Sequence, residues 1–310
     1  MLNNLFLFAA SLFLVIRGAM WATTYAARLA ENFRLSKYTV GFIVVAVISI
    51  LPETFISLNA AITGIPAFGL GMLFGSNIAD LTLIFAIITL VAGRGLKIET
   101  SILENHKPYP FLLLLPLVLG LDGHYSRVEG LALILAGIAF YYLALKKGID
   151  DAAASPVSGG RIKNAALLAG SMAILLVGAH FTVQSATMIA AAAGVNPILI
   201  GMLVVGLGTT MPELFFALKS VKKRDDALAV GDLLGTVLAD ATIVVGLIAV
   251  INPFSFPQRI IYLTGVFMVA ASFLLFRFMH SGHKLTRREA VILFVFWLVF
   301  VLVEFIANTF

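Results

Sequence analysis

The chain has 310 residues, of which 61% are hydrophobic and 12% are charged, with 21 Lys and Arg against 16 Asp and Glu. Because a soluble domain carries about 25% charged residues, this composition excludes an ordinary water-soluble enzyme. The positive residues stand in short clusters between long apolar runs, which indicates a polytopic membrane protein and not a nucleic-acid-binding protein. The absence of cysteine from the sequence excludes disulfides, thiolate metal sites and a Cys nucleophile.

Apolar runs of about 20 residues are long enough to cross a bilayer as helices. We predict an all-α membrane protein with ten transmembrane helices, near residues 4–27, 38–62, 68–92, 108–121, 128–146, 164–191, 197–219, 227–251, 258–277 and 288–307. The fourth run is short because Pro108, Pro110 and Pro116 confine it. The first run has no Lys or Arg before Arg17 and no small-residue cleavage site, so we interpret it as a retained helix and not as a signal peptide.

The positive charges predict how the chain is oriented. Eighteen of the 21 Lys and Arg residues fall in loops on one side of the predicted membrane, two fall on the other side, and Arg17 lies within a span. Since positively charged loops are usually cytoplasmic, we expect a multi-pass protein of the plasma membrane with both termini on the non-cytoplasmic side. The cytoplasmic clusters are also candidates for contacts with anionic membrane lipids.

The two halves of the sequence resemble each other at a constant offset of 160 residues, without a gap, from Ser11 and Ser171 to Asp80 and Asp240. The offset pairs Gly18 with Gly178, Pro52 with Pro212, Glu53 with Glu213, and Gly75 with Gly235. We therefore predict a first five-helix repeat at 1–146, a cytoplasmic linker at 147–163 and a second repeat at 164–310. Because five spans are an odd number, the second repeat is expected to be inverted, as in many secondary transporters with a midplane substrate site.

Four acids fall deep within predicted spans: Glu53, Asp80, Glu213 and Asp240. Each lies 11 or 12 residues from a hairpin turn, which is about 16–18 Å along a helix and so about half of a 30 Å hydrocarbon core. An ionised carboxylate there costs about 2.5–3.5 kcal/mol, so bound cations or protons must neutralise these groups. Hard oxygen ligands suit Ca²⁺, Na⁺ or Mg²⁺ better than soft metals.

Prolines and hydroxyls add oxygen ligands near these acids. Pro52 and Pro212 lack an N–H and free the backbone carbonyls four residues earlier. The hydroxyls in the same stretches belong to Ser49, Thr209, Thr210, Ser76 and Thr236. The last two each precede an Asp by four residues and share its helix face, although either hydroxyl could instead bind its own helix backbone.

Three other polar residues within spans receive less specific interpretations. Asp232 follows Asp225 and Asp226 near a predicted helix start, which favours helix capping over a functional role. Arg17 either pairs with an acid such as Glu304 or extends to the membrane surface, and the sequence does not choose between these. His180 is expected to be a hydrogen-bonded packing residue, with a larger role only if transport is coupled to protons.

Three segments resemble two signatures of the cation/Ca²⁺ antiporter superfamily, which includes the sodium/calcium exchangers. Gly208-Thr209-Thr210-Met211-Pro212-Glu213 is similar to the superfamily's G-T-S-x-P-E, Gly75-Ser76-Asn77-Ile78-Ala79-Asp80 is similar to its G-S-N-x-x-[N/D], and Gly235-Thr236-Val237-Leu238-Ala239-Asp240 is a looser copy. The resemblance covers essentially the whole chain. It implies a sodium/calcium exchanger-like fold in which the first and sixth helices slide as a pair across the rest.

The resemblance also implies the residues that hold the ions. It places Ca²⁺ around Glu53 and Glu213, with carbonyl help near Ser49 and Thr209. It places Na⁺ in flanking sites that use Ser76, Thr236, Thr210 and the carbonyls of Ala46 and Gly206, with Asp80 and Asp240 completing the arrangement.

The first copy departs from this pattern before its Pro-Glu pair, where Ile48 replaces the glycine, and again at Asp80. Where the superfamily has G-T-S before the Pro-Glu pair, this chain reads Ile48-Ser49-Ile50, and Ile50 cannot ligate an ion. Asp80 stands where a neutral Asn is common, so the four acids favour additional positive charge or a proton.

We interpret the chain as a secondary active antiporter that moves Ca²⁺ out of the cytoplasm against inward Na⁺. It is expected to be no enzyme, to need no cofactor and to have no obligate protein partner. No phosphate-binding loop is present in the sequence, so ATP is not the expected energy source. Two alternatives remain open: exchange of H⁺ for Ca²⁺ or another divalent cation, and, more remotely, an intramembrane aspartyl protease that uses the paired Asp residues.

Overall fold

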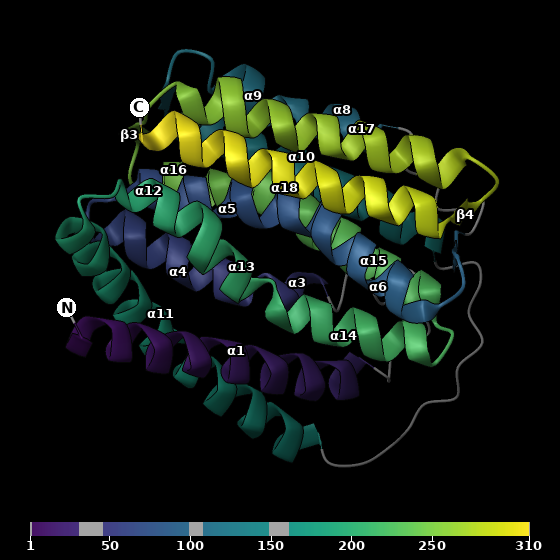
Figure 1. The fold of residues 1–310 in the computed structure, drawn as a ribbon. Helices are drawn as coiled ribbons and strands as arrows, with labels where there is room; N and C mark the ends of the chain where they lie inside the picture. Colours follow the sequence, from purple (N-terminus) through teal and green to yellow (C-terminus); the bar gives the residue numbers. More distant parts are fainter. Residues whose placement is uncertain (1, 31–45, 99–107, 149–160, 310) are drawn as a thin grey trace.

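The computed structural model describes residues 2–30, 46–98, 108–148 and 161–309, and its long elements are all helices (Figure 1). Eight helices within these ranges are long and apolar enough to cross a membrane, and Tyr109–Leu119 is a shorter apolar helix. The prediction of an all-helical, multi-pass membrane protein is therefore confirmed. The count of ten spans stays a prediction, because the start of the expected span 38–62 and most of the expected linker 147–163 lie outside the described residues.

The described elements of the first half are α1 (Leu2–Ala30), α3 (Ala46–Ser49), α4 (Leu51–Ile62), α5 (Pro66–Ala79), the π-helical turn η2 (Asp80–Ile84), α6 (Phe85–Ala92), β1 (Leu96–Lys97), α8 (Tyr109–Leu112), α9 (Leu114–Leu119), β2 (His124–Tyr125) and α10 (Arg127–Gly148).

Those of the second half are α11 (Arg161–Ala193), α12 (Pro197–Ile200), the π-helical turn η3 (Gly201–Val205), α13 (Gly206–Thr209), α14 (Met211–Lys222), α15 (Asp226–Ala239), the π-helical turn η4 (Asp240–Val244), α16 (Val245–Ile251), β3 (Phe254–Ser255), the π-helical turn η5 (Ile260–Gly265), α17 (Val266–His280), β4 (Lys284–Leu285) and α18 (Arg287–Thr309).

Several element boundaries recur at a spacing of 160 residues. The bounds of α3, α4, α5 and η2 become those of α13, α14, α15 and η4 when 160 is added. The common cause is local sequence, since each long helix after a break carries a proline in its first turn. Inside the π-helical turns, the hydroxyls of Thr82 and Thr242 donate to the carbonyls of Ile78 and Leu238, respectively.

Two short antiparallel ladders join the halves. Strand β1 of the first half pairs with β4 of the second, and β2 of the first half pairs with β3 of the second. Each ladder thus holds a loop of one half against a loop of the other half.

Helices α5, α6, α15 and α16 occupy the centre of the molecule (Figure 1). Helices α1 and α11 run side by side in opposite directions along one edge, while α17 and α18 lie at the opposite edge. The central helices are almost entirely buried, whereas α10 and α18 expose apolar side chains such as Leu135, Ile138, Leu298 and Leu302. This distribution is what a bilayer requires, because lipid tails solvate exposed apolar side chains and polar groups must be satisfied inside.

Glycines allow α5 to approach the segment from α12 to α13 closely. A Cβ on Gly71 would lie 2.6 Å from Cγ2 of Ile198, and a Cβ on Gly75 would collide with the carbonyl of Met202. On the other side of the contact, a Cβ on Gly206 would lie 3.2 Å from the Ser76 amide nitrogen. Small residues therefore bring the break before α14 against the middle of α5.

An ion pair fixes the start of α15. The Arg94 guanidinium donates to both carboxylate oxygens of Asp226, at 2.6 and 2.7 Å, and the backbone N–H of Lys97 donates to the same carboxylate at 2.9 Å. The hydrogen bonds to Asp226 raise the pKa of Arg94, so this guanidinium keeps its charge. The loop after α6 in the first half is thereby tethered to a helix of the second half.

Candidate ion-binding site

Two interrupted helices define the centre of the site. The interruptions lie at Ile50, between α3 and α4, and at Thr210, between α13 and α14. Pro52 and Pro212 follow, and because proline has no N–H, the carbonyls of Ile48 and Gly208 cannot receive the usual hydrogen bond from four residues ahead. Each interruption therefore presents a backbone oxygen within a buried region, as the sequence predicted.

Glu53 and Glu213 lie in the first turns of the helices that follow these interruptions, α4 and α14. Both residues are 0% exposed. The N-terminus of a helix carries a partial positive charge, which favours a carboxylate at that place. This dipole offsets only a fraction of a unit charge, so both groups still need a positive partner.

Asp80 and Asp240 begin the π-helical turns η2 and η4 in the middle of the two central helices. Both are buried, at 1% and 0% exposed. A π-helical turn inserts one residue into the helical pattern and is common at functional sites. The hydropathy pattern placed both Asp residues inside spans but gave no sign of the widened turns.

None of the four acids accepts a hydrogen bond of ordinary geometry, although the Thr209 side chain lies close enough to Glu53 to stabilise its carboxylate. All eight carboxylate oxygens of Glu53, Asp80, Glu213 and Asp240 are buried and unpaired. The acids are also neighbours, because Glu53 interacts electrostatically with each of the other three. Within the described ranges, however, no three acidic or histidine side chains converge closely enough to form a ready metal cluster.

The site lies between the two halves of the chain. Helix α3 of the first half packs against α15 of the second, and α13 of the second half packs against α5 of the first. Each interrupted helix therefore meets the Asp-bearing helix of the other half. In addition, the Asn77 side-chain amide donates to the Val237 carbonyl at 3.3 Å, which joins the two Asp-bearing helices directly.

The predicted hydroxyl ligands differ in what they bind. Thr209 and Thr210 donate to the carbonyls of Gly206 and Leu207, both at 3.0 Å. Ser76 donates to the Leu73 carbonyl at 3.0 Å. Its hydroxyl therefore binds its own helix backbone, which is one of the two roles expected for it. The buried Thr236 hydroxyl has no partner, so that alternative is wrong for Thr236.

The two predicted carbonyl ligands take part in the helix ladders. The Ala46 carbonyl accepts the Ile50 N–H at 3.0 Å, and the Gly206 carbonyl accepts the Thr210 N–H at 3.2 Å in addition to the Thr209 hydroxyl. A carbonyl oxygen has two lone pairs. The Ala46 oxygen therefore keeps one lone pair for an ion, whereas both lone pairs of the Gly206 oxygen already accept hydrogen bonds.

Asp232 is the residue that the sequence interpretation misplaced. It lies six residues inside α15, is 0% exposed, and accepts a hydrogen bond from the Ser49 hydroxyl at 3.0 Å. The expectation of helix capping is wrong, because α15 begins at Asp226 and Asp232 faces α3. A usable signal was the spacing of Asp232, Thr236 and Asp240, which places three polar residues on one helix face.

The structure also answers what the sequence left open about Arg17 and His180. The Arg17 guanidinium lies over the Trp21 ring, 5.2 Å from its centre, which is a cation–π contact on the same helix. Glu304 instead accepts hydrogen bonds from Thr264 and Asn308. His180 shares a hydrogen bond with the Asn59 amide at 3.2 Å, which confirms that it is hydrogen-bonded, but its exposed side chain is not packed in the core as expected.

A hollow of about 350 Å³ lies between α4 and α11 near that contact. Its lining includes the polar side chains of Asn59, Thr63, His180, Gln184 and Thr187. Asn59 and Thr63 stand at the end of α4 that lies away from Glu53, and His180, Gln184 and Thr187 belong to α11.

Comparison with known protein families decides the identity of this arrangement. The family model described as sodium/calcium exchanger protein matches residues 3–146 and again residues 163–306. The chain belongs to this family. It is accordingly an integral membrane cation/Ca²⁺ exchanger, and the predicted superfamily is confirmed.

Several individual proteins resemble this exchanger along most of its length. It is 28% identical to the inner membrane protein YrbG of Escherichia coli (strain K12), with 80% of this chain and 79% of the relative covered. It is 22% identical to the sodium/calcium exchanger MaX1 of Methanosarcina acetivorans, with 97% and 98% covered. Among solved structures, the sodium-calcium exchanger NCX_Mj soaked with Na⁺ and Sr²⁺ has the same fold, with a TM-score of 0.72, 23% identity and 96% of each chain covered.

Proposed function

We propose that this exchanger moves Ca²⁺ out of the cytoplasm against inward Na⁺ by alternating access, and that both ions bind at the midplane carboxylates. The observation that carries the proposal is the set of eight buried, unpaired oxygens on Glu53, Asp80, Glu213 and Asp240. Leaving a charged group buried and unpaired costs several kcal/mol. A transported cation is the partner that removes this cost, and only while it is bound.

The chemistry of the surrounding groups supports hard cations. Carboxylates, the unpaired Thr236 hydroxyl and the carbonyls freed by Pro52 and Pro212 are all oxygen ligands. Ca²⁺ takes six to eight such ligands in flexible geometry. Ligands that belong to both halves can also be drawn together or separated when the halves move, which is what alternating access requires.

Coupling to Na⁺ is the first candidate, since the relative MaX1 is named a sodium/calcium exchanger. A second candidate is exchange of H⁺ for Ca²⁺. It is favoured by the buried, unpaired Asp80 carboxylate in a copy where the buried Ile50 offers no hydroxyl to a Na⁺ ion. The proposal of an intramembrane protease has no comparable support, because the relatives described above are exchangers and membrane proteins.

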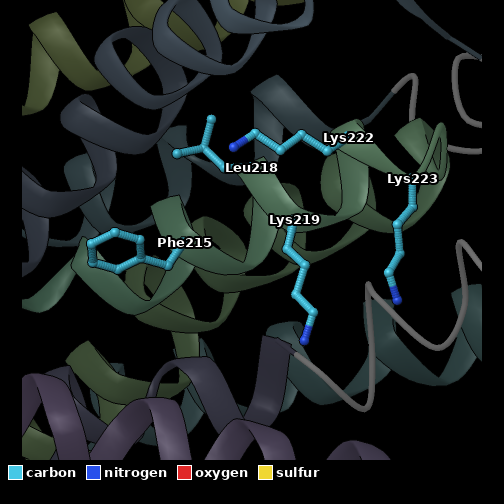
Figure 2. A pocket seen from close by; sticks show the side chains of 5 residues that line it. All are labelled: Phe215, Leu218, Lys219, Lys222 and Lys223. Carbon is cyan, nitrogen blue, oxygen red and sulfur yellow. The ribbon is translucent and has the colours of Figure 1, made fainter.

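We also propose that α14 ends at the cytoplasmic face of the plasma membrane. Lys219, Lys222 and Lys223 line a hollow of about 430 Å³ together with Phe215 and Leu218 (Figure 2). Figure 2 shows the lysines at the end of α14 and the two apolar side chains nearer its middle. Lysines above an apolar surface suit the phosphate headgroups and upper acyl chains of anionic lipids in the cytoplasmic leaflet.

The transport proposal is tested with purified protein in proteoliposomes. Glu53→Gln and Glu213→Gln should each abolish uptake of ⁴⁵Ca²⁺ driven by an ion gradient, since each removes a charge that the cation needs. Imposing a Na⁺ gradient and then a pH gradient on the same vesicles identifies the coupled ion. Transport retained by both variants would refute the site, and a parent protein that exchanges no Ca²⁺ against either gradient would refute the function.

Orientation is tested separately, because the sequence contains no cysteine to interfere. Lys223→Cys and Asp122→Cys each introduce a single thiol, at the end of α14 and in the turn before β2, respectively. In intact cells, a membrane-impermeant maleimide should label only the Asp122→Cys protein. Labelling of only the Lys223→Cys protein would reverse the proposed orientation.

A further inference from the structure

Asp232 is a buried acid close to the proposed site that the site does not use. Its side chain is 0% exposed, Oδ1 accepts the Ser49 hydroxyl at 3.0 Å, and Oδ2 is buried without a partner. It is also close enough to interact electrostatically with Glu53, Asp80 and Glu213. Asp232 therefore shares the environment of the four midplane acids.

Its position along α15 differs from theirs. Asp232 precedes Asp240 by eight residues, which is about 12 Å along a helix, and follows Asp226 by six, which is about 9 Å. The Arg94 ion pair marks the Asp226 end of this helix, on the side that the charge pattern assigns to the cytoplasm. Asp232 thus lies between the midplane acids and one membrane face.

The unpaired Thr236 hydroxyl lies one helical turn from both Asp232 and Asp240 on the same face of α15. Together with the Ser49 hydroxyl of α3, which donates to Asp232, these groups place oxygen atoms along one buried face of α15. A set of oxygen atoms of this kind has the ligand chemistry that a hard cation prefers.

The first half of the chain has no counterpart to this acid. The residue 160 positions before Asp232 is Met72, which is also 0% exposed and carries a thioether in place of a carboxylate. If α5 runs opposite to α15 across the membrane, as the odd number of spans predicts, Met72 lies toward the other face. Thus, of these two helices, α15 carries an additional negative charge before its Asp and α5 does not.

We propose that Asp232 and Ser49 form a subsite for the transported divalent cation on one side of the midplane, and that this subsite strengthens cation binding from that face alone. The inference rests on the proposed function, since it concerns the path of the same cation. It makes the exchanger asymmetric in affinity although its fold repeats.

The experiment measures Ca²⁺ affinity on each face separately. Full-length protein is expressed in cells, right-side-out and inside-out membrane vesicles are prepared, and the Ca²⁺ concentration at half-maximal exchange is determined with ⁴⁵Ca²⁺. Asp232→Asn is the informative variant because an Asn oxygen can still accept the Ser49 hydrogen bond while the charge is lost. We expect the half-maximal concentration to rise about tenfold on one face, since ligand charge sets Ca²⁺ affinity, and to stay within about twofold on the other.

Ser49→Ala keeps the Asp232 charge and removes one oxygen ligand. It should therefore raise the half-maximal Ca²⁺ concentration by about threefold, on the same face as Asp232→Asn. Because this change is small, it also tests the subsite if Asp232→Asn proves unstable. Glu304→Gln is the matched control, since Glu304 is another 0% exposed acid that accepts a hydroxyl hydrogen bond, in this case from Thr264. This variant should leave the half-maximal Ca²⁺ concentration unchanged on both faces.

The subsite would be overturned if Asp232→Asn and Ser49→Ala changed the half-maximal Ca²⁺ concentration equally on both faces, or on neither face. Ca²⁺ exchange by the parent protein would still stand in that case. A parent protein without Ca²⁺ exchange would instead refute the proposed function.

Discussion

Helices α5 and α15 occupy equivalent places in the two halves, and each leads into a π-helical turn that begins at an Asp. Along the shared face, α5 carries Met72 and Ser76 before its Asp, whereas α15 carries Asp232 and Thr236. The Ser76 hydroxyl is bound to its own helix, but the Thr236 hydroxyl is unpaired. The repeated backbone therefore does not impose repeated chemistry, so the two halves need not hold ions equally.

The largest expected effect separates the two midplane Asp residues. Asp240→Asn should lower the rate of Ca²⁺ exchange by at least about 100-fold, because losing even an outer-shell partner of a metal site costs about 10–100-fold. Asp80→Asn should lower it far less, since a neutral Asn is common at this position in the superfamily signature, but should reduce the positive charge moved per cycle by one. Tracer flux and reversal potentials in the same vesicles measure both quantities. Equal losses of flux would show that the two Asp residues are functionally equivalent.

A smaller effect concerns how α5 is packed. Gly75→Ala should lower the free energy of unfolding by about 2 kcal/mol, because the new Cβ meets the Met202 backbone and overpacking of this kind costs about 1–3 kcal/mol. Gly170→Ala is the matched control, since nothing lies within 4 Å of a Cβ at that position in α11. Thermal unfolding in detergent, followed by intrinsic fluorescence, compares them. A similar melting temperature for both variants would contradict the close contact.

The start of α15 differs from that of α5 because Asp226 is held by Arg94, whereas α5 begins with Pro66. Arg94→Gln should cost about 1 kcal/mol, near the upper end for an ion pair whose guanidinium is partly exposed. Since the hydrogen bonds from Arg94 to Asp226 raise the pKa of the guanidinium above its ordinary value, the pair's contribution should persist as pH rises to about 10. Melting temperatures across pH test this against the exposed Arg288→Gln. If Arg94→Gln lowers the melting temperature at neutral pH but no longer does so at pH 10, the pair is not permanently charged.

The smallest effect tests the interrupted helix of the first half. Ile50→Thr introduces the hydroxyl that its repeat mate Thr210 already has. If Na⁺ is the coupled ion, the Na⁺ concentration at half-maximal exchange should fall about threefold, in line with a net gain of about 0.5–1.5 kcal/mol for one polar contact. Ile50→Val controls for the change in side-chain size. An equal fall in both variants would trace the effect to packing and not to the hydroxyl.

Much of the site could be predicted because its signals are local and occur twice. Pro52, Glu53 and Asp80 each recur 160 residues later, and their depth follows from counting residues within apolar runs. Asp232 could not be placed in this way, because its mate is Met72 and its partner Ser49 is 183 residues away in sequence. The π-helical turns also escaped prediction, since one inserted residue leaves the hydropathy of a long apolar helix unchanged.

The pairing of β1 with β4 and of β2 with β3 has a consequence for how the halves stay together. Each ladder joins residues from both copies, and the buried surfaces of α5 and α15 also cross that boundary. Covalent continuity between Gly148 and Arg161 is then dispensable for the finished molecule. Two separately encoded halves, produced in the same membrane, should find each other and purify as a working complex.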